Sequence, residues 1–196
     1  MDRKEEANGD AELVRRAQAG DTKAFDELVL KFTSRLHGLV YNMTANREDT
    51  DDLLQDIFAK AYRSLRRFRG HSSFYTWIYT IAVNMTLNFL KKRGRRQTTS
   101  LEQLDFEAID RDVALGGLLS NSDPVRETHI HELQRRLNEA MLRLSEDHRA
   151  VVTMFDIQGL PHSEISEILG ISQGTVRSRL FYAHRQLQNF LEEFRR

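Results

Sequence analysis

The segment that decides the fold of this chain is Glu164–Leu180, which reads EISEILGISQGTVRSRL. Gly170 can adopt the positive φ that ends a helix, and Ser172 can cap the helix that follows. Ser166 is small, as the close crossing of two helices requires. An ordinary αα-hairpin is the simpler interpretation, but the small residue, the glycine and the cap occur together here. The segment therefore predicts a helix-turn-helix whose second helix begins near Gly174.

The predicted second helix has two unlike faces. Apolar residues recur at i, i+4, i+7, i+11 and i+15 and form a face to be buried: Val176, Leu180, Ala183, Leu187 and Leu191. Polar and aromatic residues lie roughly opposite, with two arginines on the flanks: Ser178, Phe181, Tyr182, Arg185, Arg177 and Arg179. A helix with an apolar back, a polar front and basic edges fits the major groove of DNA.

The composition favours an all-α intracellular protein. The chain has 196 residues, no cysteine and two prolines, so we expect no disulfide framework and no cysteine-built zinc site. No apolar run reaches the length of a membrane span and no signal peptide is recognisable, which favours a soluble protein of the cytoplasm. His129 and His131 form a pair without further ligands, so we expect neither a metal nor a cofactor.

Charge is segregated along the chain although it sums to zero. From Ile57 to Gln97 there is no Asp or Glu, and basic residues gather near both ends of this block: Lys60, Arg63, Arg66, Arg67, Arg69, Lys91, Lys92, Arg93, Arg95 and Arg96. From Thr98 to Pro124 the balance reverses, because acidic residues predominate there and Arg111 is the one basic residue. Blocks of opposite charge indicate separate electrostatic roles.

Helical periodicity divides the chain into two domains. The predicted helices span about residues 10–19, 21–42, 50–67 and 74–92 in the first domain, and about 126–144 and 146–158 in the second, before the helix-turn-helix. Residues 101–124 are acidic and lack a strong helical period. We therefore expect a disordered N-terminus at 1–9, a small helical domain at 10–96, a flexible acidic linker at 97–125 and a second small helical domain at 126–196.

An aromatic cluster, Phe74–Tyr79, lies in the acid-free block. Most of its rings suit a core, and Phe74, Trp77 and Ile78 fit one buried face. Aromatic rings among basic residues also form stacking platforms for unpaired bases. Asn84 follows on the same predicted helix, and its amide can read an unstacked base or bond to neighbouring backbone. The residues alone leave both interpretations open.

A third cluster lies on the preceding predicted helix. Asp52, Gln55 and Asp56 are spaced i, i+3, i+4 and therefore share a helix face. Acids at a helix N-terminus suit the helix dipole, which is the simpler explanation, and a metal site would need more ligands. A docking surface for a partner protein is the more specific hypothesis.

With these three motifs in order, the chain resembles the extracytoplasmic-function sigma factors of bacterial RNA polymerase, of the envelope-stress type. Asp52–Asp56 is similar to the segment with which the family docks on the polymerase clamp. Phe68–Gly70 and Phe74–Asn84 resemble the family's −10 element, and Gly174–Leu180 resembles its −35 reading helix. Four positions depart from the residues commonest in the family: His71, Thr80, Tyr182 and Ser166.

The resemblance implies a promoter-specificity subunit and a division of roles. Polymerase binding falls to Asp52, Gln55 and Asp56. Melting and binding of −10 DNA fall to Arg69, Gly70, His71, Ser72, Ser73, Trp77, Thr80, Asn84 and Lys91. The second domain docks on the polymerase flap and binds −35 DNA through Gly174, Thr175, Arg177, Ser178, Arg179, Phe181, Tyr182 and Arg185. The resemblance further implies that the linker threads the polymerase channels and that an anti-sigma protein, often membrane-bound, masks the chain, which itself does not insert into a membrane.

Two other functions compete with this one. A stand-alone helix-turn-helix regulator would bind a palindrome as a dimer, but the aromatic block and the linker would then have no role. A helical hydrolase could use Asp51, Asp52 and Asp56 with His71. No Gly-rich phosphate loop, nucleophile elbow or metal-spaced cluster supports such an enzyme. The sequence therefore favours a binding protein without an active site.

Overall fold

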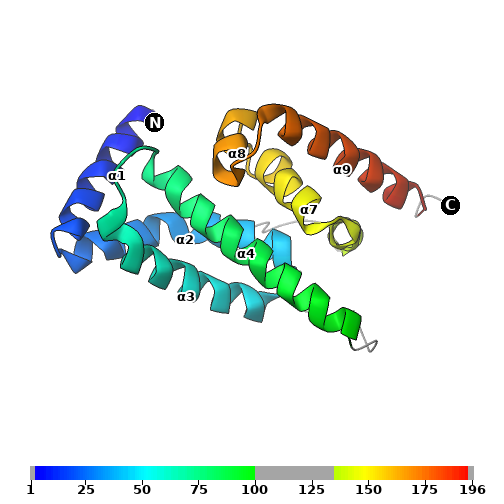
Figure 1. Ribbon diagram of the computed structural model, residues 1–196, viewed down its shortest axis with the longest axis horizontal. Coiled ribbons are helices and arrows are strands. Elements are labelled where there is room, and N and C mark those ends of the chain that lie inside the picture. Colours follow the sequence, from blue (N-terminus) through cyan, green and yellow to red (C-terminus); the bar gives the residue numbers. More distant parts are fainter. Residues whose placement is uncertain (1–2, 100–134, 194–196) are drawn as a thin grey trace, which may run out of the picture.

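The computed structural model describes residues 3–99 and 135–193, and within these ranges it contains helices and no strand. Figure 1 shows two groups of helices, one formed by α1 to α4 and the other by α7 to α9, with α4 lying between them. The all-α fold class predicted from the periodicity is confirmed. The predicted linker lies largely outside the described residues, as do His129 and His131.

The first group consists of α1 (Arg3–Gln18), α2 (Thr22–Thr44), α3 (Arg47–Ser64) and α4 (Phe74–Thr99), with a 3₁₀ turn at Leu65–Arg67 after α3. Side chains cap α2 and α3, and Ser73 caps α4. The carboxylate of Asp21 accepts the Ala24 N–H at the start of α2, and the Asn46 amide oxygen accepts the Asp49 N–H at the start of α3. The cap at Asp21 is the one that the sequence predicts.

The second group begins with a helical segment at residues 135–143 and continues with α7 (Glu146–Val152), α8 (His162–Leu169) and α9 (Gln173–Glu193). A π-helical turn, Thr153–Ile157, extends α7, and the Gln158 N–H donates to the Thr153 carbonyl five residues earlier. Gly170 ends α8 with a φ of 64°, in the left-handed region that glycine adopts without steric cost. The predicted helix-turn-helix is therefore present.

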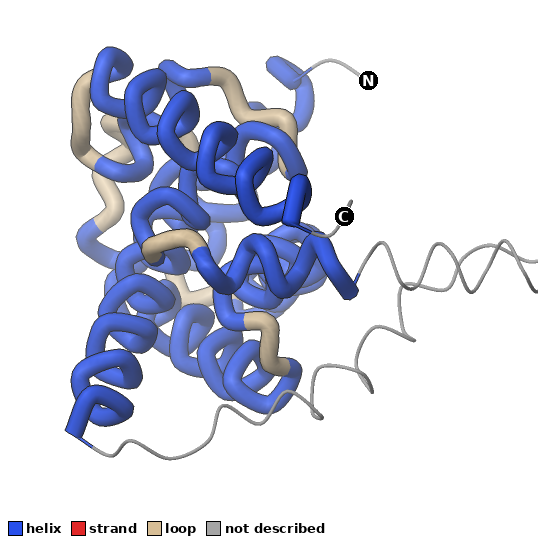
Figure 2. Tube along the Cα trace, turned by 90° about the vertical axis from the view of Figure 1, so that its right-hand side faces the viewer, coloured by secondary structure: helices blue, strands red, loops and turns tan. Residues whose placement is uncertain are grey.

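One hydrophobic core runs through both groups of helices. It continues from Phe32, Leu36 and Ile78 in the first group to Ile165 and Val176 in the second. Helix α8 packs on α4, and α7 contacts both α2 and α4. Figure 2 shows the same close packing from the side. The two groups of helices thus lie directly against each other.

Several element boundaries differ from those predicted. Helix α1 begins at Arg3 rather than near Asp10, where the predicted helix begins. The segment Lys4–Ala7 consists of good helix formers, which extend the helix toward the N-terminus. Helix α4 passes through Gly94, where it was expected to end, because a single glycine costs a helix only about 1 kcal/mol.

Burial also differs from expectation at the ends of two apolar stripes. Tyr62 on α3 is 50% exposed, although its ring packs edge-on against Phe25 at 5.0 Å between centroids. Leu191 on α9 is 37% exposed, while Val176, Leu180 and Ala183 are buried as predicted. The apolar stripe of α9 is therefore buried toward its start and partly exposed at Leu191.

Candidate nucleic-acid interface

The exposed face of α9 carries the residues predicted to read DNA. Arg177, Ser178 and Arg185 are exposed, and Phe181 and Tyr182 are 63% and 55% exposed. The two aromatic rings contact each other edge to face, with centroids 5.5 Å apart. The buried side of the same helix fixes this face toward solvent. The helix therefore presents a mixed basic and aromatic surface of the kind that fits a DNA groove.

The turn before α9 is held by two hydroxyl groups. Ser172 Oγ accepts the Thr175 N–H at 3.0 Å and so caps the helix, as the sequence predicts. Ser166 Oγ donates to the Ile171 carbonyl at 2.6 Å across the turn. Sequence reasoning valued Ser166 only for its small size and missed this bond. The hydrogen bond helps to set the angle at which α9 leaves the turn.

Arg179 differs from the other predicted −35 residues because it is paired. Its guanidinium lies 2.9 Å from Asp147 on α7, and its side chain is 27% exposed. Asp147 also lies 3.5 Å from the ammonium group of Lys91, a predicted −10 residue on α4. One carboxylate thus contacts a cation from each predicted DNA surface. Nothing in the linear sequence signals this pairing.

The loop before α4 brings together the first predicted −10 residues. Gly70 has a φ of 71°, and Arg69, Gly70 and His71 are exposed. Ser73 is exposed and also caps α4, because its hydroxyl accepts the Thr76 N–H at 3.0 Å. A residue that sequence reasoning missed supports the loop from behind. Gln18 on α1 donates to the carbonyls of Leu65 and Phe68, each at 2.8 Å.

The predicted −10 side chains on α4 lie along one side of the helix. Trp77 is half-buried between Phe68 and Phe74, whose ring centroids lie 5.0 Å and 5.5 Å away. Thr80 is half-exposed, with its hydroxyl bonded to the Thr76 carbonyl at 2.8 Å. Asn84 is exposed and makes no side-chain hydrogen bond to another residue of 3–99 or 135–193. This exposure disfavours a purely structural role for the Asn84 amide.

The remaining rings of the aromatic cluster serve the core. Phe74, Ile78 and Tyr79 are buried, and Tyr75 stacks on Tyr79 with centroids 4.2 Å apart. Burial, together with the hydrogen bond to Tyr75, raises the pKa of the Tyr79 phenol well above its ordinary value. The cluster therefore divides into a buried side and a side, around Trp77, that remains open.

The predicted docking residues lie on an exposed face of α3. Asp52, Gln55 and Asp56 are all exposed, and none of them is ion-paired with another described residue. Helix α3 begins at Arg47, so its first-turn acids are Glu48 and Asp49. The three docking residues lie beyond that first turn, where the dipole effect has faded. Dipole compensation, the simpler explanation for these acids, therefore does not account for them.

Neither a membrane segment nor a metal site is found in the described ranges. No helix among residues 3–99 and 135–193 is long and apolar enough to cross a membrane. No three side chains of His, Asp or Glu in these ranges are grouped as metal ligands.

Comparison with known proteins identifies the family. The family models for Sigma-70 region 2 and Sigma-70 region 4 match residues 28–96 and 134–187. RNA polymerase sigma-H factor of Pseudomonas aeruginosa is 38% identical over 184 residues, which are 93% of this chain and 94% of that protein. ECF RNA polymerase sigma-E factor of Escherichia coli is 39% identical over 182 residues, 92% of this chain and 93% of that protein. The chain belongs to the extracytoplasmic-function sigma factors of RNA polymerase.

Two solved structures share the fold of this sigma factor. CnrH in complex with the cytosolic domain of CnrY aligns with a TM-score of 0.66 at 20% identity, covering 94% of this chain and 98% of CnrH. The sigma factor RpoE from Bartonella quintana, in complex with the anti-sigma factor NepR, also aligns with a TM-score of 0.66, at 23% identity, covering 87% of this chain and 98% of RpoE. The family resemblance stated from the motifs is confirmed, and the chain is a transcription initiation factor.

Proposed function

We propose that this sigma factor directs core RNA polymerase to promoters through three surfaces on two domains. The domain at 10–96 holds the polymerase-docking and −10 surfaces, and the domain at 126–196 holds the −35 surface. Residues 97–125 join them as a linker that spans the distance between the promoter elements. In this role the chain binds polymerase and DNA in the cytoplasm, and catalysis belongs to the polymerase rather than to any site of its own.

The observation that carries the proposal is the geometry of the helix-turn-helix. A buried stripe orients α9 so that its opposite face is open to solvent from Ser178 to Arg185. On this face Phe181, Tyr182 and Arg185 are placed for base edges, and Arg177 at the flank is placed for phosphate. Gly174 and Thr175 lie in the first turn of α9, where backbone N–H groups favour a phosphate. The −35 element is thus read in the major groove.

Melting of the −10 element is assigned to the loop Arg69–Ser73 and the side of α4 that carries Asn84. Extruding a base costs a few kcal/mol of stacking and pairing, which a closely fitting pocket must offset. Trp77 lies between two rings and is held firmly, and Asn84 presents a donor and an acceptor to solvent. Lys91, further along α4, is placed to hold the DNA backbone.

The exposed acidic face of α3 fits a basic surface on the polymerase clamp. Asp52 and Asp56 repel DNA phosphates, and together with Gln55 they are open to a protein partner. Control by an anti-sigma protein is supported by the structural relative RpoE, which was solved with the anti-sigma factor NepR. Such a protein would mask the docking face of α3 and a face of the second domain.

Two experiments test this function. A duplex carrying −35 and −10 elements should bind the chain in a sequence-specific way only when core polymerase is present, whereas a stand-alone regulator would bind a palindrome without polymerase. For the −10 surface, Asn84→Ala should reduce permanganate reactivity at the promoter and relax base preference at a single −10 position. Closed-complex binding should change little. Equal loss for all four bases at every −10 position would contradict the assignment of Asn84.

A further inference from the structure

The loop Arg69–Ser73 is anchored at both of its ends. At its exit, the Ser73 hydroxyl accepts the Thr76 N–H at 3.0 Å. At its entry, Phe68 leaves the preceding 3₁₀ turn with φ −69° and ψ 117°. Residues 69–71, between these ends, have no hydrogen bond or ion pair with any other residue of 3–99 or 135–193. The course of the loop therefore depends on how its two ends are held.

A side chain from α1 holds the entry to the loop. Gln18 Nε2 donates to the carbonyls of Leu65 and Phe68, each at 2.8 Å. The amide nitrogen carries two hydrogens, so both of its donors are used. Because a carbonyl accepts but cannot donate, only the nitrogen end of the Gln18 amide fits between the two acceptors. The orientation of this side chain is therefore fixed by its partners.

The ring and the carbonyl of Phe68 are held by different groups. The ring packs against Phe74 and Trp77, with centroids 6.1 Å and 5.0 Å away. These contacts fix the position of Phe68, but rotation about its Cα–C bond would still swing the next peptide group. The hydrogen bond from Gln18 to the Phe68 carbonyl restricts that rotation. Gln18 thus sets the direction in which the chain enters the loop.

Helix α1 is a firm support for Gln18. Arg16 donates two hydrogen bonds to Asp21 at 3.0 Å and 2.7 Å, and this carboxylate also caps α2. Val14 is buried in the core of the same domain, and the Gln18 side chain is itself half-buried. The amide of Gln18 therefore extends from a backbone that is fixed against α2.

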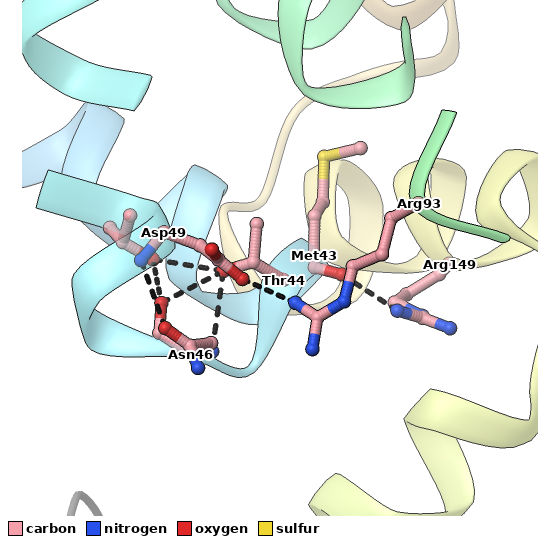
Figure 3. Close-up of polar contacts among 7 residues, drawn as sticks. Met43, Thr44, Asn46, Asp49, Arg93 and Arg149 are labelled. Atoms are coloured by element: carbon pink, nitrogen blue, oxygen red, sulfur yellow. Dashed lines mark hydrogen bonds and ion pairs between the residues drawn. The ribbon is translucent and has the colours of Figure 1, made fainter. Parts of the chain in front are cut away.

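The opposite end of the α3–α4 pair is tied without any part of α1. Arg93, late in α4, forms an ion pair with Asp49 in the first turn of α3 (Figure 3). Asn46 caps α3 at the same place, and its amide oxygen accepts the Asp49 N–H at 2.9 Å. Since these contacts hold the two helices together, removal of the Gln18 amide should act on the loop rather than on the helix pair.

We propose that Gln18 is a positioning residue for promoter recognition, through which α1 contributes to base preference in the −10 element. The inference rests on the proposed function of the loop Arg69–Ser73 in binding −10 DNA. Gln18 itself touches no DNA. Without its two donors the loop can follow several courses, so a smaller fraction of chains presents the pocket that fits one extruded base.

Two variants of Gln18 remove its donors and keep its length. Gln18→Met is apolar, and Gln18→Glu places acceptor oxygens against the two carbonyls. Thr86→Val is the matched control, because it removes a buried hydrogen bond, from Thr86 Oγ1 to the Ala82 carbonyl at 2.8 Å, within the same domain. Thr86 belongs to none of the proposed binding surfaces. Urea unfolding of each full-length chain shows that the variants fold and measures their loss of stability.

The first test measures base preference at −10. Each chain is assembled with core polymerase, and open complexes are detected with permanganate on promoters that carry each of the four bases at each −10 position. We expect Gln18→Met to reduce the preference for the best base by about two- to tenfold, the effect of one net hydrogen bond on an equilibrium. Gln18→Glu should reduce it at least as much. Thr86→Val should keep the parent preference, and closed-complex binding should be unchanged in all three variants.

Two outcomes of this test would overturn the role of Gln18. One is an unchanged base preference in a folded Gln18→Met or Gln18→Glu chain. The other is an equal loss of preference in Thr86→Val, which would show that base preference follows the stability of the domain and not the anchoring of the loop.

The second test needs neither polymerase nor DNA. In nitrogen-15 relaxation measurements on the full-length chain, we expect the Gly70 amide to be more mobile in Gln18→Met than in the parent and in Thr86→Val. Equal mobility of Gly70 in all three chains would overturn the anchoring. The proposed function fails separately, if the parent chain with core polymerase shows no base preference at any −10 position while Gly70 still responds to Gln18→Met.

Discussion

At the scale of single residues, the buried guanidinium of Arg149 has the largest structural consequence. The side chain is 6% exposed and bonds to four backbone carbonyls. Burial lowers the pKa of Arg149, but four acceptors keep the cation solvated by the protein. The residue looks like an ordinary exposed cation in the sequence, because its partners are backbone atoms distant along the chain.

Arg149→Ala should lower the free energy of unfolding by about 3 kcal/mol or more, because hydrogen bonds to a charged donor contribute about 1.5–3 kcal/mol each and the carbonyls would be left unsatisfied. Arg177→Ala is the matched control, since it removes the same charge from an exposed site of the same domain and should change stability by less than about 0.5 kcal/mol. Urea unfolding followed by circular dichroism measures both. Similar losses in the two variants would contradict the role given to Arg149.

Asp21 is a second residue with a testable electrostatic role. Its carboxylate accepts hydrogen bonds from Arg16 at 3.0 Å and 2.7 Å and also caps α2. The Arg16 hydrogen bond is the main cause of a lowered pKa at Asp21. A lowered pKa in the folded state contributes stability that is present above the unfolded pKa and lost as pH falls through the folded pKa.

We therefore expect carbon-13 NMR titration to place the pKa of Asp21 below that of an unstructured aspartate, and Arg16→Ala to move it upward. Asp21→Asn keeps an acceptor for the cap and should remove this residue's share of the acid-induced loss of stability. An Asp21 pKa that did not respond to Arg16→Ala would show that the cap alone perturbs the carboxylate.

At the scale of secondary-structure elements, α9 divides its arginines between different partners. Arg177 and Arg185 are exposed, while Arg179 is held by Asp147 on α7. Sequence reasoning grouped Arg177 and Arg179 as equivalent flanks, because a helical wheel cannot show which flank faces another helix. The two flanks of α9 therefore differ: Arg179 is paired and Arg177 is exposed.

Arg185→Ala should reduce discrimination at one −35 position by about 1–3 kcal/mol, as expected for a lost base contact. Arg177→Ala should weaken binding to every −35 variant alike and lower the slope of log affinity against log salt by about one. Anisotropy titrations of the holoenzyme against a panel of −35 duplexes at several salt concentrations separate the two effects. The assignment of roles is wrong if both variants lose affinity uniformly.

Helix α4 shows how an element can serve two purposes. Its buried side joins the core of the first domain and supports α8, and its open side carries Asn84 and Lys91. The helix continues past Gly94 to Thr99, so the start of the connection to the second domain is helical. The length of α4 could not be predicted, because one glycine lowers helix stability by too little to mark an end.

At the scale of the whole molecule, the predicted docking face lies on α3, the predicted −10 surface on the loop Arg69–Ser73 and α4, and the predicted −35 surface on α9. Asp52→Ala with Gln55→Ala should weaken binding to core polymerase and leave the melting temperature nearly unchanged, because both side chains are exposed and unpaired within the described chain. Direct titration of labelled chain with core polymerase measures the affinity. Asp26→Ala with Glu27→Ala on α2 removes exposed acids elsewhere and serves as the control. Unchanged affinity in a well-folded Asp52/Gln55 variant would rule out this docking surface.

The sequence by itself determined the elements and their faces. Local rules are strong where a cap, a glycine and a periodic stripe agree, which is why Asp21, Gly170 and the buried side of α9 could be predicted. The order of the three motifs was sufficient for the family, because each motif is short and contiguous. Structure that depends on contacts between residues close together in the sequence can be predicted from the sequence.

The tertiary structure alone decided how the domains meet. The contacts of Arg149 with Met43, of Gln158 with Arg35 and of Asp147 with Lys91 join residues far apart in the sequence. Two of these contacts end on backbone carbonyls, which every residue type carries, so no sequence pattern distinguishes the acceptor. The third contact joins two charged side chains, and the sequence around each one predicts only an exposed residue. Such pairings follow from the packing of whole helices, and only the folded chain brings them together.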